Sequence, residues 1–328
     1  MVRLLFLAGH RAAHLADERI TLEFSVIIPL FNKRASIGCA IQSVLNQTHR
    51  EFKLFVVNDG STDGGEHIAK KFADPRVRVV DQPNRGEAAA RNTGIRAATS
   101  THVAFLDADD CWKPEFLSLI QQLIDRHPAA AIYGTGIEAI EEDGTRSLPE
   151  SVERFIDMSG RLDYPSALAR WVFPLSSSSV SVPIGKFGEV GLFDERLKLA
   201  TDIDMWVRLC LSGPAYFDRR IGATYHKDAL CRSTTVQSEF WDKRLFFVDV
   251  LHERLQAPGI ALRDRRNLER FLAQVTYEAL VAKANADREF NLGRAMRDRK
   301  QHLTLKHSLF GQARRFKYIG RGLFGGVP

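Results

Sequence analysis

The run Phe24–Leu30 reads FSVIIPL and is followed directly by polar residues. A nearly continuous apolar run of this length is typical of a strand that is buried on both faces of a sheet. Three further short runs rich in apolar and β-branched residues follow, at 52–57, 77–82 and 102–107. Segments of helical periodicity lie between and after these runs, at 34–47, 66–72, 84–99 and 115–126. Buried strands that alternate with helices predict an α/β, Rossmann-like fold with a mainly parallel sheet flanked by helices.

The pattern changes after Tyr133, and the chain divides into three predicted parts. Residues 1–23 are expected to be a poorly ordered leader, and 24–235 to be the main domain. Within that domain, the serine-rich segment 175–188 (LSSSSVSVPIGKFG) suggests loops and an irregular sheet. Residues 236–328 are charged and helical in period, and they predict a helical C-terminal extension that ends in a basic tail.

The composition is that of an ordinary soluble globular protein, with 328 residues, 45% hydrophobic and 26% charged. No apolar run approaches the roughly 20 residues that a membrane-spanning helix needs. Four cysteines, far apart and without a CxxC pair, predict reduced thiols in a cytoplasmic protein. They argue against a disulfide framework or a zinc site.

The positive charge is concentrated at the end of the chain. The net charge is +6, but from residue 287 onward ten Lys and Arg stand against three Asp and Glu, so the remainder is close to neutral. This distribution argues against nucleic-acid binding by the whole protein. Two interpretations of the tail remain open: a solvated helical end, or a peripheral contact with the anionic inner face of a membrane, aided by interspersed aromatic residues.

The strongest chemical signal is the stretch 103–114, VAFLDADDCWKP, in which an apolar run ends in three carboxylates. Carboxylates this close repel one another unless a cation lies between them. With only oxygen ligands nearby, Asp107 and Asp109 predict a site for a hard ion, Mg²⁺ or Mn²⁺. The alternative is a solvated acidic turn, with Asp110 as the cap of the next helix or a supporting residue.

Other polar residues follow the remaining predicted strands. Ligands of open parallel sheets bind outside the carboxyl ends of the strands, so these residues are expected to share one edge. Asp59 could accept a hydrogen bond from a nucleotide base, although NDGSTD is also good turn chemistry. Phe31 could stack on a base or pack in the core. Gly86 and Arg91 open a helix that suits an anion, but they could equally be a turn residue and a surface charge.

Several common enzyme motifs are absent from the sequence. No Gly-x-Gly-x-x-Gly follows the first strand, and no Gly-x-x-x-x-Gly-Lys-Ser/Thr occurs, which argues against a dinucleotide oxidoreductase and a P-loop enzyme. The Gly-x-Ser-x-Gly turn of α/β-hydrolases is also missing.

In combination, these segments resemble the family-two glycosyltransferases of the GT-A fold. The resemblance is carried in order by SVIIPLFNK, AIQSVLNQT, VVNDGSTD, NRGEAAARNTGI and VAFLDADDCWKP, and more weakly by GEVGLFDERLKLATDIDMWVRLC (188–210). It implies transfer of a sugar, with inversion, from a nucleotide-diphosphate donor to an acceptor hydroxyl, and we expect this donor to be a UDP-sugar. It also implies a nucleotide-binding half, 24–135, and an acceptor half, 136–235, and a saccharide or lipid-linked acceptor of surface polysaccharide, lipopolysaccharide or glycolipid synthesis.

The resemblance implies a role for each matching residue. Nucleotide-sugar binding falls to Pro29, Phe31, Asp59, Arg91 and Asp107, the metal ligand is Asp109, and the general base is Asp202. Asp202 could alternatively cap the helix that follows it. Thr201 stands where the family commonly has Glu, and the 175–188 segment lacks two basic residues that relatives often carry. Two alternatives stay open: a nucleotidyltransferase, which can share a similar fold and a metal–diphosphate site, and a non-catalytic module that binds sugar nucleotides, which Thr201 would suit.

Overall fold

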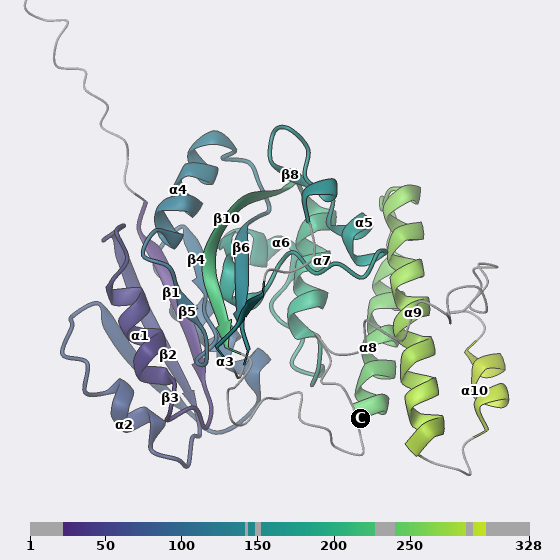
Figure 1. Cartoon of the computed structure of the whole chain (residues 1–328), viewed down its shortest axis with the longest axis horizontal. Helices are drawn as coiled ribbons and strands as arrows, with labels where there is room; N and C mark the ends of the chain where they lie inside the picture. The colour runs from purple at the N-terminus through teal and green to yellow at the C-terminus, as the bar shows by residue number, and fades with distance from the viewer. Residues whose placement is uncertain (1–21, 142–143, 148–151, 227–239, 287–290, 300–328) are drawn as a thin grey trace, which may run out of the picture.

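The computed structural model describes residues 22–141, 144–147, 152–226, 240–286 and 291–299. In this part of the chain ten strands form one sheet, ordered β3-β2-β1-β4-β9-β6-β10-β5, while β7 pairs with β6 and β8 with β10 (Figure 1). The strands are β1 (Phe24–Leu30), β2 (Phe52–Asp59), β3 (Val77–Gln82), β4 (His102–Phe105), β5 (Cys111–Trp112), β6 (Ile132–Ile140), β7 (Arg146–Ser147), β8 (Arg161–Leu162), β9 (Val180–Pro183) and β10 (Ala215–His226). β1 pairs in parallel with β2 and β4, β2 with β3, and β6 with β10, which confirms the predicted mainly parallel sheet.

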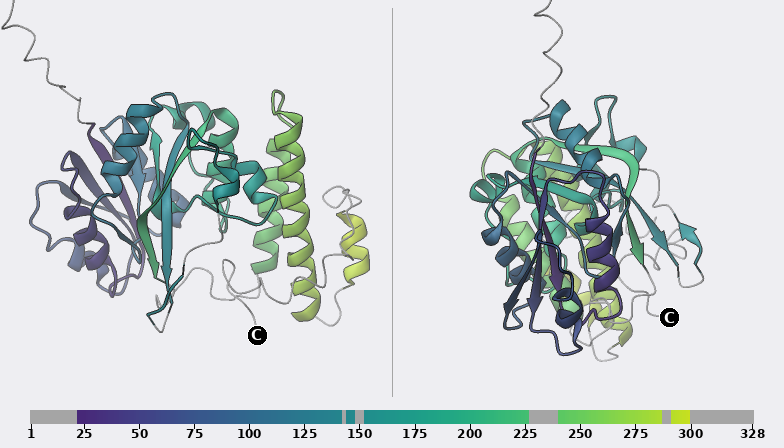
Figure 2. Two further views of the ribbon diagram at one scale, coloured as in Figure 1. Left: turned by 45° about the horizontal axis from the view of Figure 1, so that its top comes forward. Right: turned by 90° about the vertical axis from the view of Figure 1, so that its left-hand side faces the viewer.

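Helices cover both faces of this sheet. They are α1 (Ile37–Leu45), α2 (Gly65–Ala69), α3 (Glu87–Ala97), α4 (Phe116–Arg126), α5 (Tyr164–Leu168), α6 (Lys186–Val190), α7 (Thr201–Ser212), α8 (Phe240–Leu255), α9 (Leu262–Ala286) and α10 (Leu292–Asp298), with short 3-10 turns η1 (Glu153–Phe155) and η2 (Ser177–Ser179). Figure 2 shows the sheet edge-on, between the helix layers. None of the described helices is both long and apolar enough to cross a membrane.

Strand β1 explains why both faces need cover. Side chains alternate along a strand, so Val26 and Ile28 point to one face and Ile27 to the other. Val26 and Ile28 join the apolar cluster beneath α1 and α4, and Ile27 joins the cluster beneath α3 and α7. All three are fully buried, as the uninterrupted apolar run predicted.

The serine-rich segment, for which loops and an irregular sheet were predicted, forms the 3-10 turn η2 and the strand β9 of the sheet. β9 lies between β4 and β6 and is antiparallel to both. Ser177, Ser178 and Ser179 are at most 3% exposed, and the hydroxyl of Ser181 donates to the carbonyl of Val103 at 3.0 Å. Small hydroxyl side chains fit this depth because the neighbouring backbone satisfies their hydrogen bonds. A search for continuous apolar runs cannot find a buried strand that is flanked by serines in this way.

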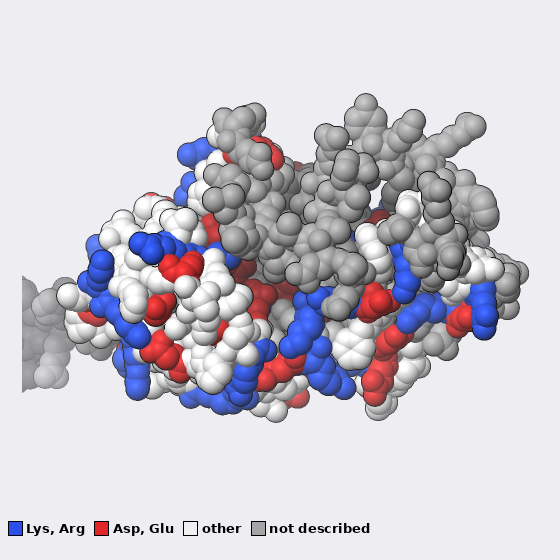
Figure 3. All heavy atoms as spheres, turned by 90° about the horizontal axis from the view of Figure 1, so that it is seen from below, with Lys and Arg blue, Asp and Glu red and all other residues white. Residues whose placement is uncertain are grey.

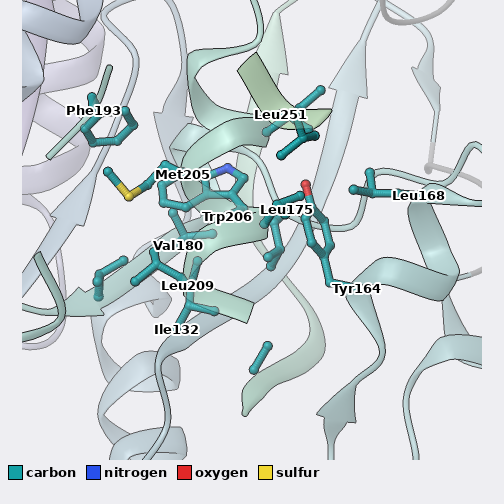
Figure 4. Close-up of a cluster of buried hydrophobic side chains, with 14 of the residues drawn as sticks. Ile132, Tyr164, Leu168, Leu175, Val180, Phe193, Met205, Trp206, Leu209 and Leu251 are labelled. Carbon is teal, nitrogen blue, oxygen red and sulfur yellow. The ribbon is translucent and has the colours of Figure 1, made fainter. Parts of the chain in front are cut away.

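The C-terminal helices share the main hydrophobic core. Trp206 and Leu209 of α7 meet Tyr164, Leu175 and Leu251 in the cluster of Figure 4. Leu251 belongs to α8, and residues of α9 extend the same cluster. Helices α8, α9 and α10 lie in the range predicted as a helical extension. The predicted boundary at 235, the leader up to residue 21 and the tail from residue 300 lie outside the described residues.

The structure also brings two cysteines together, which the sequence did not suggest. Cys39 of α1 and Cys111 of β5 have their Sγ atoms 2.7 Å apart, and both are free thiols. Their separation of 72 positions along the chain hid this contact, because sequence spacing reports only local proximity.

His102 at the start of β4 gives a stability prediction that does not depend on function. It is 9% exposed, lies between the rings of Phe24 and Tyr133, and burial lowers its pKa to about 4. The unfolded chain binds a proton near pH 6.5, so the unfolded state takes up more protons below that pH. The contribution of His102 to the free energy of unfolding is therefore fully present above pH 6.5, and it is lost as the pH falls towards 4. Between pH 7.5 and 5 we expect a loss of about 2 kcal/mol from this group.

Urea denaturation of the wild type and His102→Phe at both pH values measures this effect. The aromatic replacement keeps ring packing but cannot titrate, so its free energy of unfolding should fall less between pH 7.5 and 5, by about 2 kcal/mol. Equal pH dependence in the two proteins would contradict the assignment.

Candidate active site

The polar ends of β1, β2 and β4 lie at one edge of the sheet, together with the first residues of α3 and α7. Figure 3 views the molecule towards this edge and shows acidic side chains gathered in a central recess. Two of the three described non-glycine residues with positive φ lie here, Asn32 (51°) and Ala200 (56°). Such backbone strain is concentrated at functional sites, because only a rigid surrounding structure sustains it.

Asp107 and Arg91 form the centre of this edge. The Nη2 atom of Arg91 donates to Oδ1 of Asp107 at 2.8 Å and also contacts Glu87 one helical turn earlier. Arg91 is only 2% exposed, so the alternative of a surface charge is wrong. Burial raises the pKa of Asp107 to about 6; Glu87 and Asp109 add to this rise and Arg91 opposes it. The site therefore carries more negative charge than Arg91 alone balances.

Arg91 also connects the carboxylates to the start of α7. Its Nη1 atom donates to the hydroxyl of Thr201 at 3.3 Å. Thr201 immediately precedes Asp202, so one guanidinium joins the end of β4 to the helix that carries the predicted base. The residue by which this chain departs from the family pattern is thus a hydrogen-bond partner of the central arginine.

Asp109 has a cationic partner within the chain. The Nζ atom of Lys33 lies 2.5 Å from Oδ2 of Asp109, and both side chains are less than one fifth exposed. Lys33 follows β1 and lies 76 positions before Asp109 in the sequence. It was not among the predicted site residues. Its place directly after a buried strand was the one available signal, since such ends converge on the ligand edge.

Asp110 is buried and supports the turn; it does not cap a helix. The next helix begins at Phe116 with Glu115 at its N-cap, so the capping prediction is wrong. Asp110 is 1% exposed and accepts a hydrogen bond from the hydroxyl of Ser178, which also accepts from the backbone N–H of Asp107 at 3.1 Å. Burial raises the pKa of Asp110, and the charges of Asp107 and Asp109 raise it further. Ser178 therefore couples the buried serine segment to the acidic turn.

Asp59 fixes the loop before α3. Its Oδ1 accepts from Nε2 of Gln82 at 2.7 Å and from the backbone N–H of Arg85 at 2.9 Å, and its Oδ2 accepts from the N–H of Gly86 at 2.8 Å. The side chain is 2% exposed. A nucleotide base could donate to this carboxylate only in addition to these three partners. Asp59 therefore stabilises the loop before α3, besides its predicted contact with the base.

The two residues predicted to line the base pocket differ in exposure. Phe31 is 45% exposed, so the alternative that it packs in the core is wrong and its ring is available for stacking. Pro29 is half-buried within β1, opposite Val57 of β2. Stacking against an exposed aromatic ring needs no side-chain movement, which makes Phe31 the more accessible of the pair.

Asp202 is the second residue of α7 and is not its cap. Ala200 occupies the N-cap position in the left-handed region. Oδ1 of Asp202 accepts from the N–H of Ile203 at 2.8 Å. Burial raises the pKa of Asp202, while the nearby charge of Arg91 opposes that rise. A half-buried carboxylate with a raised pKa at a ligand edge is suited to accept a proton.

The C-terminal extension holds α7 in place through an ion-pair network that the sequence did not reveal. Asp204 is fully buried and pairs with Arg208 of the same helix and with Arg254 of α8, at 2.8 and 2.5 Å. Arg254 also pairs with Asp194 at 2.7 Å. Because Asp204 lies two residues after Asp202, α8 helps to determine where the predicted base lies.

The acidic turn is chemically suited to a divalent cation. Asp107 and Asp109 offer oxygen ligands only, and Asp109 already attracts an ammonium group. Within the described ranges, no three His, Cys, Asp or Glu side chains are arranged to hold a metal ion. The two carboxylates would therefore supply a minority of the ligands, as Mg²⁺ commonly accepts when phosphates and water complete its shell.

Comparison with known proteins relates this chain to glycosyltransferases. The sequence profile described as "Glycosyl transferase family 2" matches residues 25–174. A Bacillus subtilis protein named putative teichuronic acid biosynthesis glycosyltransferase TuaG is 31% identical over 193 residues, which are 58% of this chain and 72% of that protein. An uncharacterized glycosyltransferase of Rickettsia felis is 28% identical over 249 residues, which are 73% of this chain. The chain spans about two fifths of the length of that relative and of a second one from Rickettsia bellii.

Solved structures share the fold at low sequence identity. S. aureus TarS 1-349 in complex with UDP-GlcNAc has a TM-score of 0.60 and 20% identity, covering 86% of this chain and 82% of that chain. The mannosyltransferase PcManGT of Pyrobaculum calidifontis, in complex with GDP-Man and Mn²⁺, has a TM-score of 0.57 and 17% identity, covering 87% and 81%.

The predicted GT-A fold is confirmed by these neighbours and by the mainly parallel sheet with helices on both faces. The sequence relatives point to the same class of enzyme, and the TuaG match covers most of that protein. This chain therefore belongs to glycosyl transferase family 2.

Proposed function

We propose that this glycosyltransferase moves a sugar, with inversion, from a nucleotide-diphosphate donor, a UDP-sugar, to an acceptor hydroxyl. One observation carries the proposal: Arg91 contacts Asp107 on the donor side and Thr201, the neighbour of Asp202, on the opposite side. A leaving group and an attacking hydroxyl bound between these residues would be held in line. The alternatives of nucleotidyl transfer and of a binding module lose support, because the family is one of glycosyltransferases.

Asp202 acts as the general base in this proposal. Its carboxylate removes the proton from the acceptor hydroxyl while the new glycosidic bond forms, and the bond from the anomeric carbon to the diphosphate breaks. The raised pKa brings the carboxylate closer to the operating pH and makes it a better base than an ordinary aspartate. The backbone N–H of Ile203 holds one carboxylate oxygen and leaves the other for the hydroxyl.

The donor side is built by residues of the first half of the chain. Phe31 stacks on the base, Pro29 and Asp59 line the pocket, and Asp107 and Asp109 face the ribose and diphosphate. Mg²⁺ or Mn²⁺ at these carboxylates would neutralise the charge that develops on the departing diphosphate. Lys33, whose ammonium lies 2.5 Å from Asp109, is placed next to this carboxylate and would contact a donor phosphate bound there.

The acceptor is proposed to be a saccharide or a lipid-linked saccharide of surface polysaccharide, lipopolysaccharide or glycolipid synthesis. The support is the name of TuaG, which places that relative in teichuronic acid biosynthesis. The predicted membrane contact of the basic tail lies outside the described residues.

A thermal-shift screen of UDP- and GDP-sugars, with and without Mn²⁺, tests the donor assignment. A ligand that binds only the native state raises stability by about 2.7 kcal/mol at a concentration of 100 times Kd. We expect a UDP-sugar to do so only when Mn²⁺ is present, because the metal would join its diphosphate to Asp107 and Asp109. Asp109→Asn should lose most of the Mn²⁺-dependent shift. Asp125→Asn, an exposed change on α4, should retain it. A panel without any Mn²⁺-dependent stabilisation would contradict the proposal.

A further inference from the structure

A second concave site lies at the opposite edge of the sheet from the active site. It is a cavity of about 750 Å³ between the region of α5 and the first turns of α9, which contact each other directly (Figure 1). A neighbouring cavity is lined by Gly213 and Ala215, where α7 has ended and β10 begins. Because Asp202 lies at the other end of α7, about 16 Å of helix separate it from this neighbouring cavity.

This cavity is strongly basic. Its lining includes five arginines, Arg154, Arg170, Arg263, Arg266 and Arg270, and a single carboxylate, Asp163; we call it the basic cleft. Arg263 pairs with Asp163, whereas the other four arginines form no ion pair with any described residue. The neighbouring cavity shares Arg154, Arg263 and Asp163 with the basic cleft, and it adds one further arginine and two further aspartates, Arg161, Asp157 and Asp264. The excess charge therefore lies in the part of the basic cleft lined by Arg170, Arg266 and Arg270, which the neighbouring cavity lacks.

The arginines are arranged on a fixed frame. Arg263, Arg266 and Arg270 follow the i, i+3, i+7 spacing of one helical face and extend over about 10 Å along α9. The amide of Asn267, between them, donates to the hydroxyl of Ser166 at 2.9 Å and joins α9 to α5. Asp163 caps α5 by accepting from the N–H of Ser166 at 3.1 Å. The two walls are thus held together by polar contacts while the remaining guanidinium groups stay available.

The chemistry of these side chains selects the kind of ligand. Guanidinium groups donate two parallel hydrogen bonds and match the oxygens of phosphate groups. Four arginines without an ion-pair partner among the described residues exceed what one singly charged group could balance, and the cavity volume falls within the range of about 300–1,000 Å³ that is common for ligand pockets. We propose that the basic cleft binds a ligand carrying two or more phosphate charges, such as a diphosphate group, at a site separate from sugar transfer. This inference does not depend on the proposed function.

Isothermal titration with inorganic pyrophosphate tests the site, using the full chain in EDTA so that metal-dependent binding at the active site is suppressed. We expect the double variant R266Q/R270Q to bind pyrophosphate at least tenfold more weakly than the wild type. A second variant on the facing wall, R154Q/R170Q, should show a similar loss. The matched control R78Q/R96Q removes the same charge from exposed arginines of β3 and α3 and should change affinity less than twofold.

Sedimentation with vesicles distinguishes the source of the phosphate. Cardiolipin vesicles, whose headgroup carries two phosphates, would identify a lipid headgroup if they bind the wild type but not R266Q/R270Q, whereas pyrophosphate binding alone would identify a soluble phosphate compound; either result supports the cleft. The proposal is overturned if neither ligand binds, if both cleft variants bind like the wild type, or if R78Q/R96Q loses as much affinity as they do. Thermal unfolding of each variant confirms that the fold is kept.

Discussion

Asp202→Asn is expected to lower the turnover number for sugar transfer by about 10²–10⁴-fold, the range that a positioned general base contributes. The amide has nearly the shape of the carboxylate, and its oxygen can still accept from the N–H of Ile203, so α7 should not move. Donor binding depends on the other side of the site and should be retained. Steady-state kinetics with the donor found by the thermal-shift screen, together with donor affinity by titration, measures the two quantities separately.

The pH dependence provides an independent check of the same residue. Because burial raises the pKa of Asp202, its carboxylate is protonated at a higher pH than an ordinary aspartate, and the wild-type rate should fall as pH drops through that raised pKa. Asp202→Asn should lack this acidic limb. Asp125→Asn serves as the matched control and should keep both the rate and the limb. Transfer that survives Asp202→Asn at the wild-type rate would contradict the assignment of the base.

Arg91→Met is expected to lower the free energy of unfolding by about 3 kcal/mol, the lower end of the range for removing one partner of a buried ion pair. Arg91 is 2% exposed and contacts Glu87, Asp107 and Thr201. Methionine fills the volume but leaves the carboxylates without their counter-charge. The lower end applies because Glu87 and Asp107 are 48% and 28% exposed and can regain water. Urea denaturation measures the change.

Arg96→Met is the matched control for this substitution. Arg96 belongs to the same helix but is exposed, so its replacement should stay within about 0.5 kcal/mol of the wild type. Arg91→Lys should fall between the two, because it keeps the charge but has a single nitrogen in place of the planar fork that contacts both Asp107 and Thr201. Equal stability of Arg91→Met and Arg96→Met would show that the buried bridge contributes little.

The extension adds a structural role to a region that has no recognisable motif. Arg254 reaches from α8 to Asp204 and Asp194, and the core beneath α7 includes Leu251. The helix that carries the proposed base is therefore supported from the C-terminal side. The glycosyltransferase fold and its extension act as one packed unit in the described part of the chain.

Much of the fold could be predicted because its signals are local. The bounds of β1 and β3 agree with the predicted runs, and β2 extends two residues further, to Asp59. β4 is shorter than predicted, since it ends at Phe105 before the acidic turn. An irregular sheet was predicted around β9, but the bounds of this strand were not, because serines whose hydroxyl groups bond to the backbone carry no apolar pattern. Helix ends shifted by up to three residues, as caps and turns compete there.

The candidate active site also has residues that could be predicted from the sequence and partners that could not. Asp59, Arg91, Asp107 and Asp109 could be placed at one edge because the carboxyl ends of parallel strands and the helices after them converge there. Their partners could not be placed. Lys33 meets Asp109 across 76 positions, Ser178 meets Asp110 across 68, and Arg254 meets Asp204 across 50.

The sequence by itself determined the buried strands, their mainly parallel arrangement and the residue types at the ligand edge, because apolar periodicity and strand ends are local properties. The tertiary structure alone decided which charges are paired, which are buried and which remain available. It made Arg91 a buried bridge, gave Asp110 a serine partner and gathered five arginines at the opposite edge. The physical reason is that ion pairing and desolvation depend on distances between residues far apart in the chain, and no local pattern encodes those distances.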